Sequence, residues 1–366
     1  MKTKILHLIV GLKTGGAERM LQKLVLNMNN GAFEQKIITL TSLGPIGVEL
    51  RKKGFEIFEL NMRKDILSLF KVYGEIKNII GVYTPDVVVP WMYHSIFLTV
   101  VFKRIFSKDT RFIWNIRHTI YDLKHEKIIT TNIIKFLIKH STIPQAIIYN
   151  SEESRKSHEK LGYHKSNGKV LLNGFDSQIF KPTPYLINSE YFVIGIVARY
   201  HPLKDYPTFL EAASIFVKKN LKTRFVMVGR GVDRCNTELM DLIKKYNLEN
   251  HVDLRGERKD IERIITNFNV FTLSSYSESF PNVLGEAMLC GVPCVSTDVG
   301  MASDIVSSYG LIVDKQEPFQ IADAWEKLMN LDIASLKALK VGAREHIIEN
   351  YSIQKIAKEY ERILLD

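Results

Sequence analysis

The stretch VFTLSSYSESFPNVLGEAMLCGVPCVST (Val270–Thr297) carries three structural signals in succession. It begins with a short apolar run, crosses a polar loop to Pro281, and then shows apolar residues at helical spacing. Proline suits the start of a helix, because the N–H group that it lacks has no partner there. A second apolar run, Pro293–Thr297, follows. A strand, a helix and a strand in this order predict a unit with parallel strands.

The same alternation extends outward through the second half of the chain. The predicted strands are Phe192–Ala198, Arg224–Val228, Val252–Arg255, Val270–Leu273 and Pro293–Thr297. The predicted helices are Tyr206–Asn220, Glu238–Tyr246, Asp260–Asn267 and Val283–Cys290. Strands that alternate with helices are typical of a parallel sheet covered by helices on both faces.

The first half shows the same organisation. Its predicted strands are Ile5–Val10, Lys36–Leu40, Glu56–Leu60, Asp86–Pro90, Arg111–Ile116 and Ala146–Tyr149, and its clearest predicted helices are Val48–Lys53 and Ile66–Val82. The 366 residues suffice for two domains. We therefore predict an α/β fold with two doubly wound, Rossmann-like domains that face a cleft, at residues 1–180 and 181–350. The hinge is predicted at Lys181–Ser189, and residues 351–366 are predicted to form a helix that packs back toward the first domain.

The composition limits the class of protein. Hydrophobic residues make up 46% and charged residues 25% of the chain, as in ordinary globular proteins. Three cysteines are too few and too irregularly spaced for a disulfide framework or a zinc site. No apolar run approaches the length of a membrane-spanning helix, and Met1–Leu12 does not resemble a signal peptide. We expect the protein to be cytoplasmic.

The positive charge is concentrated in one half of the chain. Residues 1–180 hold 27 Lys and Arg against 15 Asp and Glu, whereas residues 181–366 hold 23 against 25. A basic domain can attract nucleic acid, an anionic membrane surface or an acidic substrate, or it can simply be solvated. The chain shows no recognisable motif for RNA or DNA binding, so a nucleic-acid-binding protein is disfavoured.

Two glutamates flank the start of the predicted helix Val283–Cys290. Glu278 lies in the loop before it and Glu286 lies about one turn into it. The amides of Asn282, Val283 and Leu284 would form a positive helix terminus suited to phosphate. Carboxylates accept hydrogen bonds from sugar hydroxyls, so the pair suits a nucleotide sugar. The alternative is that Glu278 caps the helix and Glu286 is a surface acid.

Two cations follow the predicted strand Phe192–Ala198. Arg199 and Lys204 lie where the carboxyl end of that strand is expected. Arginine binds phosphate oxygens in pairs and lysine adds a compact charge, so together they can neutralise a diphosphate. The chain contains no Asp-x-Asp motif. These residues predict diphosphate binding without a metal, whereas each cation alone could be an ordinary surface charge.

The chain resembles glycosyltransferase family 4, the retaining GT-B enzymes. The resemblance rests on ESFPNVLGEAM, with its Glu-x7-Glu spacing, and on motifs along nearly the whole chain. These motifs are GGAER (Gly15–Arg19), IRHT (Ile116–Thr119), YNSEES (Tyr149–Ser154), NGFD (Asn173–Asp176), VARYHPLKD (Val197–Asp205), VGRG (Val228–Gly231) and LRGERKDI (Leu254–Ile261). It implies a GT-B fold and transfer of a sugar from a nucleotide donor with retention of configuration and no metal. One departure from the family is Gly285, where a larger apolar residue is usual.

The resemblance also implies the roles of individual residues. Catalytic roles would fall to His118, Arg199, Lys204 and Glu278, with His118 facing the donor sugar unless it is a structural histidine. Glu286 would hold the donor ribose. The other donor-binding residues would be Gly15, Gly16, Gly229, Ser279, Phe280, Pro281, Asn282, Val283 and Leu284. No metal ligand and no cofactor besides the nucleotide-sugar co-substrate is expected.

The expected activity is therefore a retaining glycosyltransferase that uses a nucleotide-diphosphate sugar, with UDP as the expected nucleotide. The resemblance to bacterial enzymes implies a saccharide or lipid-linked saccharide acceptor in the synthesis of capsule, O-antigen or lipopolysaccharide. The alternative activity is a nucleotide-sugar epimerase of GT-B type, which would need no acceptor. A dehydrogenase is disfavoured, because Gly11, Gly15 and Gly16 do not form G-x-G-x-x-G.

The basic first half also suggests docking on the inner face of the cytoplasmic membrane. The stretches IFLTVVFKRIF (Ile96–Phe106) and IIKFLIKH (Ile133–His140) combine apolar side chains with cations. Their apolar residues are predicted to enter the lipid headgroup region. The cations predicted to meet lipid phosphates are Lys103, Arg104, Lys135 and Lys139. The alternative is that both stretches are core helices with solvated lysines.

Overall fold

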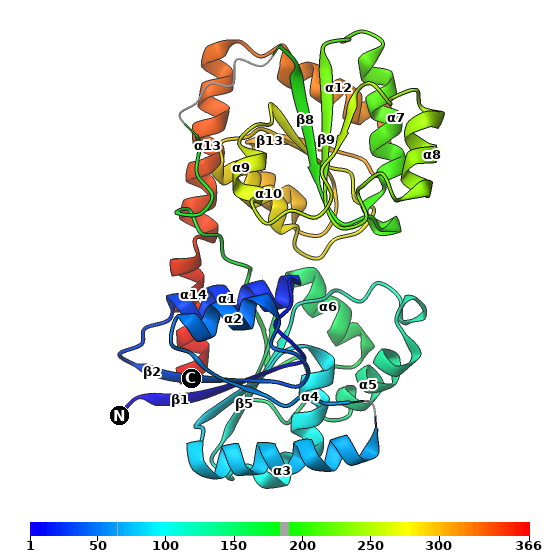
Figure 1. Cartoon of the computed structure of the whole chain (residues 1–366). Coiled ribbons are helices and arrows are strands. Elements are labelled where there is room, and N and C mark those ends of the chain that lie inside the picture. The colour runs from blue at the N-terminus through cyan, green and yellow to red at the C-terminus, as the bar shows by residue number, and fades with distance from the viewer. Residues whose placement is uncertain (64, 184–189) are drawn as a thin grey trace. The chain divides into compact units, whose positions relative to one another are not determined.

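The computed structural model describes residues 1–63, 65–183 and 190–366. The chain forms two compact units, each built on one parallel sheet (Figure 1). The first unit comprises Met1–Gly174 with Ile353–Asp366, and the second comprises Phe175–Ser352. The predicted α/β fold with two Rossmann-like domains is confirmed. Part of the predicted hinge, residues 184–189, lies outside the described residues.

The first unit contains a seven-stranded sheet of order β3-β2-β1-β4-β5-β6-β7. Its strands are β1 (Thr3–Ile9), β2 (Phe33–Thr39), β3 (Glu56–Glu59), β4 (Val87–Pro90), β5 (Arg111–Ile116), β6 (Ala146–Tyr149) and β7 (Gly168–Val170). Its helices are α1 (Gly16–Asn27), α2 (Gly44–Lys52), α3 (Ile66–Tyr83), α4 (Met92–Val101), α5 (Ile128–Ile138), α6 (Glu152–Leu161) and α14 (Ile353–Leu365). The strand order reverses direction between β1 and β4, and ligands of such sheets bind beyond the strand ends at this point.

Helices cover both faces of this sheet, and each face has its own core. On one face, α1, α2 and α14 pack against Ile5 and Ile37. On the other, α3 and α4 pack against Leu6 and Val88, and α5 packs near Trp114. Figure 1 shows α1 and α2 on the opposite side of the strands from α3. Both faces are therefore apolar, as expected for a parallel sheet.

The second unit contains a six-stranded sheet of order β10-β9-β8-β11-β12-β13. Its strands are β8 (Phe192–Val197), β9 (Thr223–Val228), β10 (Val252–Leu254), β11 (Val270–Leu273), β12 (Cys294–Thr297) and β13 (Gly310–Val313). Its helices are α7 (Tyr206–Val217), α8 (Thr237–Lys245), α9 (Ile261–Ile265), α10 (Asn282–Leu289), α11 (Ala302–Val306), α12 (Pro318–Met329) and α13 (Ile333–Tyr351). Its strand order reverses between β8 and β11.

The C-terminal helix α14 belongs to the first unit. Its side chains Ile356 and Tyr360 are buried in the same core as α1. Glu361 accepts a hydrogen bond from the Asn29 amide at 2.6 Å, and the Leu364 carbonyl accepts one from Arg111 at 2.6 Å. The end of the chain thus completes the core of the unit in which the chain begins.

The two stretches predicted to enter lipid are mainly core segments. Ile96, Leu98 and Phe102 of the first stretch are buried, as are Ile134 and Leu137 of the second. They pack against the sheet because α4 and α5 supply the apolar layer on that face. The prediction that their apolar side chains enter the headgroup region is therefore wrong. The four cations Lys103, Arg104, Lys135 and Lys139 are exposed, and their contact with lipid phosphates stays a prediction.

Candidate active site

Two loops of the second unit meet at the carboxyl ends of β8 and β11. The loop after β8 carries Arg199 and contains a short 3-10 turn that ends at Lys204. The Ser274 hydroxyl, directly after β11, donates to the Lys204 carbonyl at 2.9 Å. The Tyr276 amide donates to the Leu203 carbonyl, also at 2.9 Å. These bonds hold the two loops together where the strand order reverses.

Lys204 forms an ion pair with Glu278 across the two loops. The Lys204 Nζ contacts Glu278 Oε1, and the Ser275 hydroxyl donates to the same oxygen at 2.9 Å. The side chains of Lys204 and Glu278 are only 21% and 15% exposed. Sequence analysis predicted both residues for the site but missed the pair, because 74 positions separate them. Their placement after β8 and β11, which are neighbours in the sheet, is the signal that could have found it.

Arg199 adds positive charge to the same loop. Its side chain is exposed, and no carboxylate among the residues that the structure describes pairs with it. The pKa of His201 is lowered by partial burial and further by the charges of Arg199 and Lys204. His201 Nδ1 accepts a hydrogen bond from the Leu203 amide at 3.2 Å. Arg199 and Lys204 thus place two cations in this loop, and cations favour the binding of an anion.

The start of α10 differs in part from the prediction. Pro281 occupies the N-cap position, and no side chain caps the helix, so Glu278 is not a capping residue. The Leu284 amide donates to the Pro281 carbonyl at 3.1 Å. The prediction of three available amides is therefore wrong for Leu284, because the first turn of the helix uses it. The side chains of Phe280 and Leu284 are buried and belong to the core.

Glu286 is not a surface acid. It lies in the second turn of α10 and is 9% exposed, in a helix whose other buried residues are apolar or small. Its charge contributes, after burial, to raising the pKa of Cys290 to about 12. Retaining a carboxylate at such a position normally requires polar partners. Because Glu286 is buried, the alternative that it is a surface acid is excluded.

Two glycines allow the loops of the site to approach closely. Gly229, at the end of β9, has a φ of +153°, and a side chain there would collide with the Ala198 carbonyl, next to Arg199. Gly300 has a φ of +52°, and a side chain there would collide with the carbonyl groups of Glu278 and Ser279. Residues other than glycine rarely adopt such a backbone and would also displace the loops.

Phe175 explains the unusual glycine at position 285. A side chain on Gly285 would collide with the ring of Phe175, which belongs to the NGFD motif. The Phe175 ring also stacks on Phe280, with ring centroids 5.9 Å apart. Phe175 thus fills the space that a larger residue at position 285 would occupy.

The remaining predicted residues belong to the first unit. His118 lies just beyond β5, and its Nε2 is 2.7 Å from Glu126 Oε1. The Ser154 hydroxyl donates to the His118 carbonyl at 2.6 Å, and the Tyr93 ring lies edge-on to the imidazole. Sequence analysis did not single out Glu126, because nothing in its neighbourhood marks it as a partner of His118. A carboxylate can only accept here, so it orients the imidazole.

Gly15 and Gly16 form the start of α1 in the first unit. Gly15 is the N-cap residue, and a side chain on it would collide with the Glu18 carboxylate. Gly16 lines a pocket of about 310 Å³ together with Trp91, Met92 and Arg117, beyond the ends of β1 and β4. The predicted glycine loop therefore lies at the reversal point of its sheet.

A larger pocket of about 820 Å³ lies elsewhere in the second unit. Tyr191, Arg224 and Phe268 are among its lining residues. None of the predicted site residues lines it. The charged and polar contacts lie instead in the loops after β8 and β11, which form the candidate site.

Comparison with known proteins identifies the family. A family model described as "Glycosyl transferases group 1" matches residues 177–365, which is more than half of the chain. The chain belongs to this family. The matched segment contains the ion pair, both predicted glutamates and the cation Arg199, so the family assignment covers the candidate site of the second unit.

Several curated relatives of this group 1 glycosyl transferase are similar in sequence. It is 25% identical over 244 residues to the N-acetyl-alpha-D-glucosaminyl L-malate synthase of Bacillus anthracis, covering 64% of this chain and 62% of the relative. It is 26% identical over 216 residues to the UDP-Gal:alpha-D-GlcNAc-diphosphoundecaprenol alpha-1,3-galactosyltransferase of Escherichia coli, covering 54% of each. It is 27% identical over 205 residues to the capsular polysaccharide biosynthesis glycosyltransferase CapM of Staphylococcus aureus, covering 55% and 53%. Each match spans less than two thirds of the relative's length.

Solved structures show the same fold over almost the whole chain. Anabaena HepE, solved with UDP and glucose, superposes with a TM-score of 0.83 at 20% identity and covers 99% of both chains. The lipopolysaccharide outer core galactosyltransferase WaaB superposes with a TM-score of 0.75 at 14% identity, also over 99% of both chains. At these identities the likeness shows the GT-B fold alone.

Proposed function

We propose that this protein transfers a sugar from a nucleotide-diphosphate donor, a UDP-sugar, to a saccharide or lipid-linked saccharide acceptor. The observation that carries the proposal is the convergence of Arg199, Lys204 and Glu278 at the carboxyl ends of β8 and β11. Two cations and a carboxylate in one place suit a ligand that joins a diphosphate to a hydroxyl-rich sugar.

In the proposed reaction, the bond between the anomeric carbon and the diphosphate oxygen breaks. A bond from the same carbon to the acceptor hydroxyl oxygen forms, and the acceptor proton passes to the departing phosphate. Arg199 and Lys204 stabilise the negative charge that develops on the diphosphate. The acceptor attacks from the face that the leaving group vacates, so the configuration of the anomeric carbon is retained. No protein nucleophile is required.

We assign a different role in donor binding to each residue of the site. Glu278 accepts hydrogen bonds from the transferred sugar, while Lys204 and Arg199 bind phosphate oxygens. Glu286, held in α10, accepts hydrogen bonds from the ribose of the nucleotide. For the first unit we propose that His118 faces the donor sugar and that Gly15 and Gly16 let the donor and acceptor approach closely. With two cations in these roles, the reaction requires no metal and no cofactor besides the donor.

The names of the relatives support an acceptor of the bacterial surface. The Escherichia coli relative is named for a diphosphoundecaprenol-linked sugar acceptor, and the Staphylococcus aureus relative for capsular polysaccharide. We propose that this protein extends a surface polysaccharide of the capsule, O-antigen or lipopolysaccharide type. We propose that the protein works in the cytoplasm, at the inner face of the membrane.

A panel of nucleotide sugars tests this function. Purified protein is incubated with each UDP-, GDP- and ADP-sugar, with and without lipid-linked saccharides, and release of the nucleoside diphosphate is followed by chromatography. We expect turnover of one UDP-sugar, unchanged in excess EDTA, and a product whose anomeric configuration matches the donor by NMR. Conversion of the donor to a different free nucleotide sugar without any acceptor would identify the epimerase instead. Loss of turnover in EDTA, restored by Mg²⁺ or Mn²⁺, would contradict the metal-independent mechanism.

A further inference from the structure

Helix α3 exposes large apolar side chains at its N-terminal end. Its inner side packs against the sheet through Val72 and Ile76. By contrast, Ile66, Leu67 and Phe70 are 70%, 77% and 70% exposed. Exposed apolar residues that stand alone are ordinary, whereas contiguous groups mark interaction sites.

These side chains are contiguous along the helix. Ile66, Leu69, Phe70 and Tyr73 follow the spacing i, i+3, i+4, i+7, which places them in one row. Leu69 and Tyr73 are partly exposed and continue the row toward the middle of the helix. We call these four residues, with Leu67, the α3 ridge. None of these five residues is among the buried residues of α3, and none belongs to the proposed active site.

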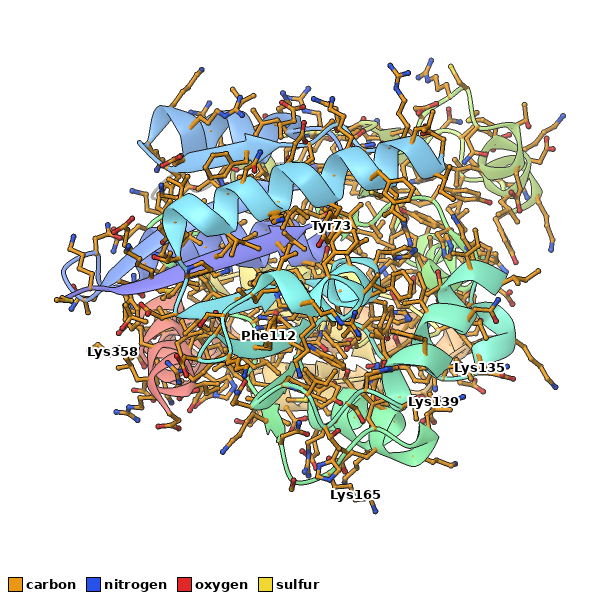
Figure 2. The ribbon with its side chains drawn as sticks, turned by 90° about the horizontal axis from the view of Figure 1, so that it is seen from below. Tyr73, Phe112, Lys135, Lys139, Lys165 and Lys358 are labelled. Atoms are coloured by element: carbon orange, nitrogen blue, oxygen red, sulfur yellow. The ribbon has the colours of Figure 1, made fainter. Side chains whose placement is uncertain are left out.

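Cations lie beside the α3 ridge. The Tyr73 ring packs edge-on against Phe102, with ring centroids 5.0 Å apart, and Lys103 and Arg104 follow Phe102 directly and are exposed. Lys135 on α5 and Lys139 just after it are exposed, and α5 covers the same face of the sheet as α3. Figure 2 looks onto this face and labels Tyr73 beside α3, Lys135 on α5 and Lys139 just after α5.

The segment that contains α3, α4 and α5 carries a large excess of positive charge. Residues 61–140, which contain α3, α4 and α5, hold 13 Lys and Arg against six Asp and Glu. Among the acids, Asp65 caps α3 by accepting from the Ser68 amide, and Glu75 lies 3.7 Å from Lys71. Apolar side chains beside exposed cations complement a surface that is negatively charged outside and apolar beneath. No helix within the described part of the chain has the length and apolar character needed to cross a bilayer.

We propose that the α3 ridge inserts into the headgroup region of an anionic bilayer, while the cations beside it meet lipid phosphates. This inference rests on the proposed function, because it assumes that the acceptor is linked to a lipid. The predicted partner, an anionic membrane, is the same. The apolar contact is now assigned to the α3 ridge, because apolar side chains of Ile96–Phe106 and Ile133–His140 pack in the core. Docking through one face of the first unit would hold the enzyme at the inner face of the cytoplasmic membrane, where lipid-linked acceptors are concentrated.

Vesicle co-sedimentation tests the inference. Full-length protein is mixed with vesicles of phosphatidylcholine alone or with one third phosphatidylglycerol, at low and high salt. We expect salt-sensitive binding to the anionic vesicles only. Ile66→Ser with Phe70→Ser should weaken it by about tenfold or more, because both side chains lose their apolar burial in lipid. Lys103→Glu with Arg104→Glu should weaken it at low salt and reduce its salt dependence.

Phe319→Ser with Ile333→Ser is the matched control. These two side chains are 69% and 87% exposed and belong to the second unit, whereas α3 belongs to the first. The control should bind like the wild type, and thermal unfolding should show that every variant folds. Equal and negligible binding to both vesicle types at low salt would overturn the inference. So would binding that the α3 ridge variant leaves unchanged, or a dimer in analytical ultracentrifugation that the same variant disrupts, since a second copy would then cover the ridge.

Turnover of the nucleotide sugar in the absence of vesicles separates this inference from the proposed function. The α3 ridge variant should hydrolyse the donor like the wild type, because the ridge lies outside the proposed site. If vesicle binding fails while donor turnover persists, only the docking inference is wrong. If no nucleotide sugar is turned over, the proposed function is wrong whatever the vesicles show.

Discussion

The Lys204 ammonium group contacts the Glu278 carboxylate, and the Ser275 hydroxyl donates to the same carboxylate oxygen at 2.9 Å. This contact joins the loop after β8 to the loop after β11. It brings together one residue proposed to bind phosphate and one proposed to bind sugar. The pair therefore defines the orientation in which a nucleotide sugar would lie.

Lys204→Met should lower donor turnover by about 100-fold or more, because it removes a preorganised charge at the departing diphosphate. The fold should survive with a loss of about 1 kcal/mol, since the pair is partly exposed. The measurement is nucleotide release, with urea unfolding to follow stability. Lys219→Met is the control, because Lys219 pairs with Glu326 at 3.4 Å on the surface. Wild-type turnover in Lys204→Met would contradict the assignment.

Glu286→Gln should weaken binding of the nucleotide by about tenfold or more, because a neutral amide replaces a charged acceptor for the ribose hydroxyls. Glutamine has the same shape, so folding should be retained, whereas alanine would leave a hole in a buried position. Calorimetric titration with UDP gives the affinity. Glu345→Gln, exposed on α13, should bind UDP like the wild type. Unchanged affinity in Glu286→Gln would place the ribose elsewhere.

Gly300→Ala should raise the KM for the donor and destabilise the second unit by about 1 kcal/mol or more, because φ there is +52° and a methyl group would push against the backbone of Glu278. Gly256→Ala separates the two effects. Gly256 has a φ of +63°, but the nearest atom to an added methyl group is 4.0 Å away. It should lose stability without a change in KM. Equal kinetic effects in both variants would exclude a specific role of the Glu278 loop.

Glu126→Ala should lower kcat by about tenfold with little change in KM, because the imidazole of His118 loses the acceptor that orients it. Nitrogen NMR of the wild type should show a proton on Nε2 of His118, facing the carboxylate. Glu126→Gln should restore part of the activity, since its amide oxygen can accept the same hydrogen bond. The control Glu153→Gln changes a carboxylate on α6 that accepts a hydrogen bond from the Tyr121 hydroxyl at 3.5 Å. A wild-type NMR signature in Glu126→Ala would show that the contact does not orient the ring.

Acid should destabilise the first unit through two buried histidines. Burial lowers the pKa of both His7 and His158 from 6.5 to about 4. Above pH 6.5 both are neutral in the folded and unfolded states, but below it only the unfolded state binds the protons. Each histidine therefore costs up to about 2 kcal/mol as the pH falls from 6.5 to 5. Urea unfolding at both pH values measures the loss, and His158→Gln should remove its share. An unchanged pH dependence in that variant would contradict the assignment to His158.

The linear sequence determined the fold class of this protein. Strands with apolar residues on both faces, such as Val87–Pro90, alternate with helices whose apolar residues recur at helical spacing, and these local patterns survive in the structure because parallel sheets bury both faces. The sequence also located the loops of the candidate site, since Arg199 and Glu278 lie in loops that follow predicted strands. Their predicted catalytic and binding roles stay predictions.

Tertiary structure alone decided which side chains meet and which are exposed. Lys204 and Glu278 pair because β8 and β11 are neighbours in the sheet, an arrangement that depends on strand order and not on sequence distance. Ile96, Leu98 and Phe102 are as apolar as Ile66, Leu67 and Phe70, yet the first three side chains are buried and the second three are exposed. The difference arises because a helix buries the side that the sheet covers, and the position of the sheet is set by contacts distant in the sequence.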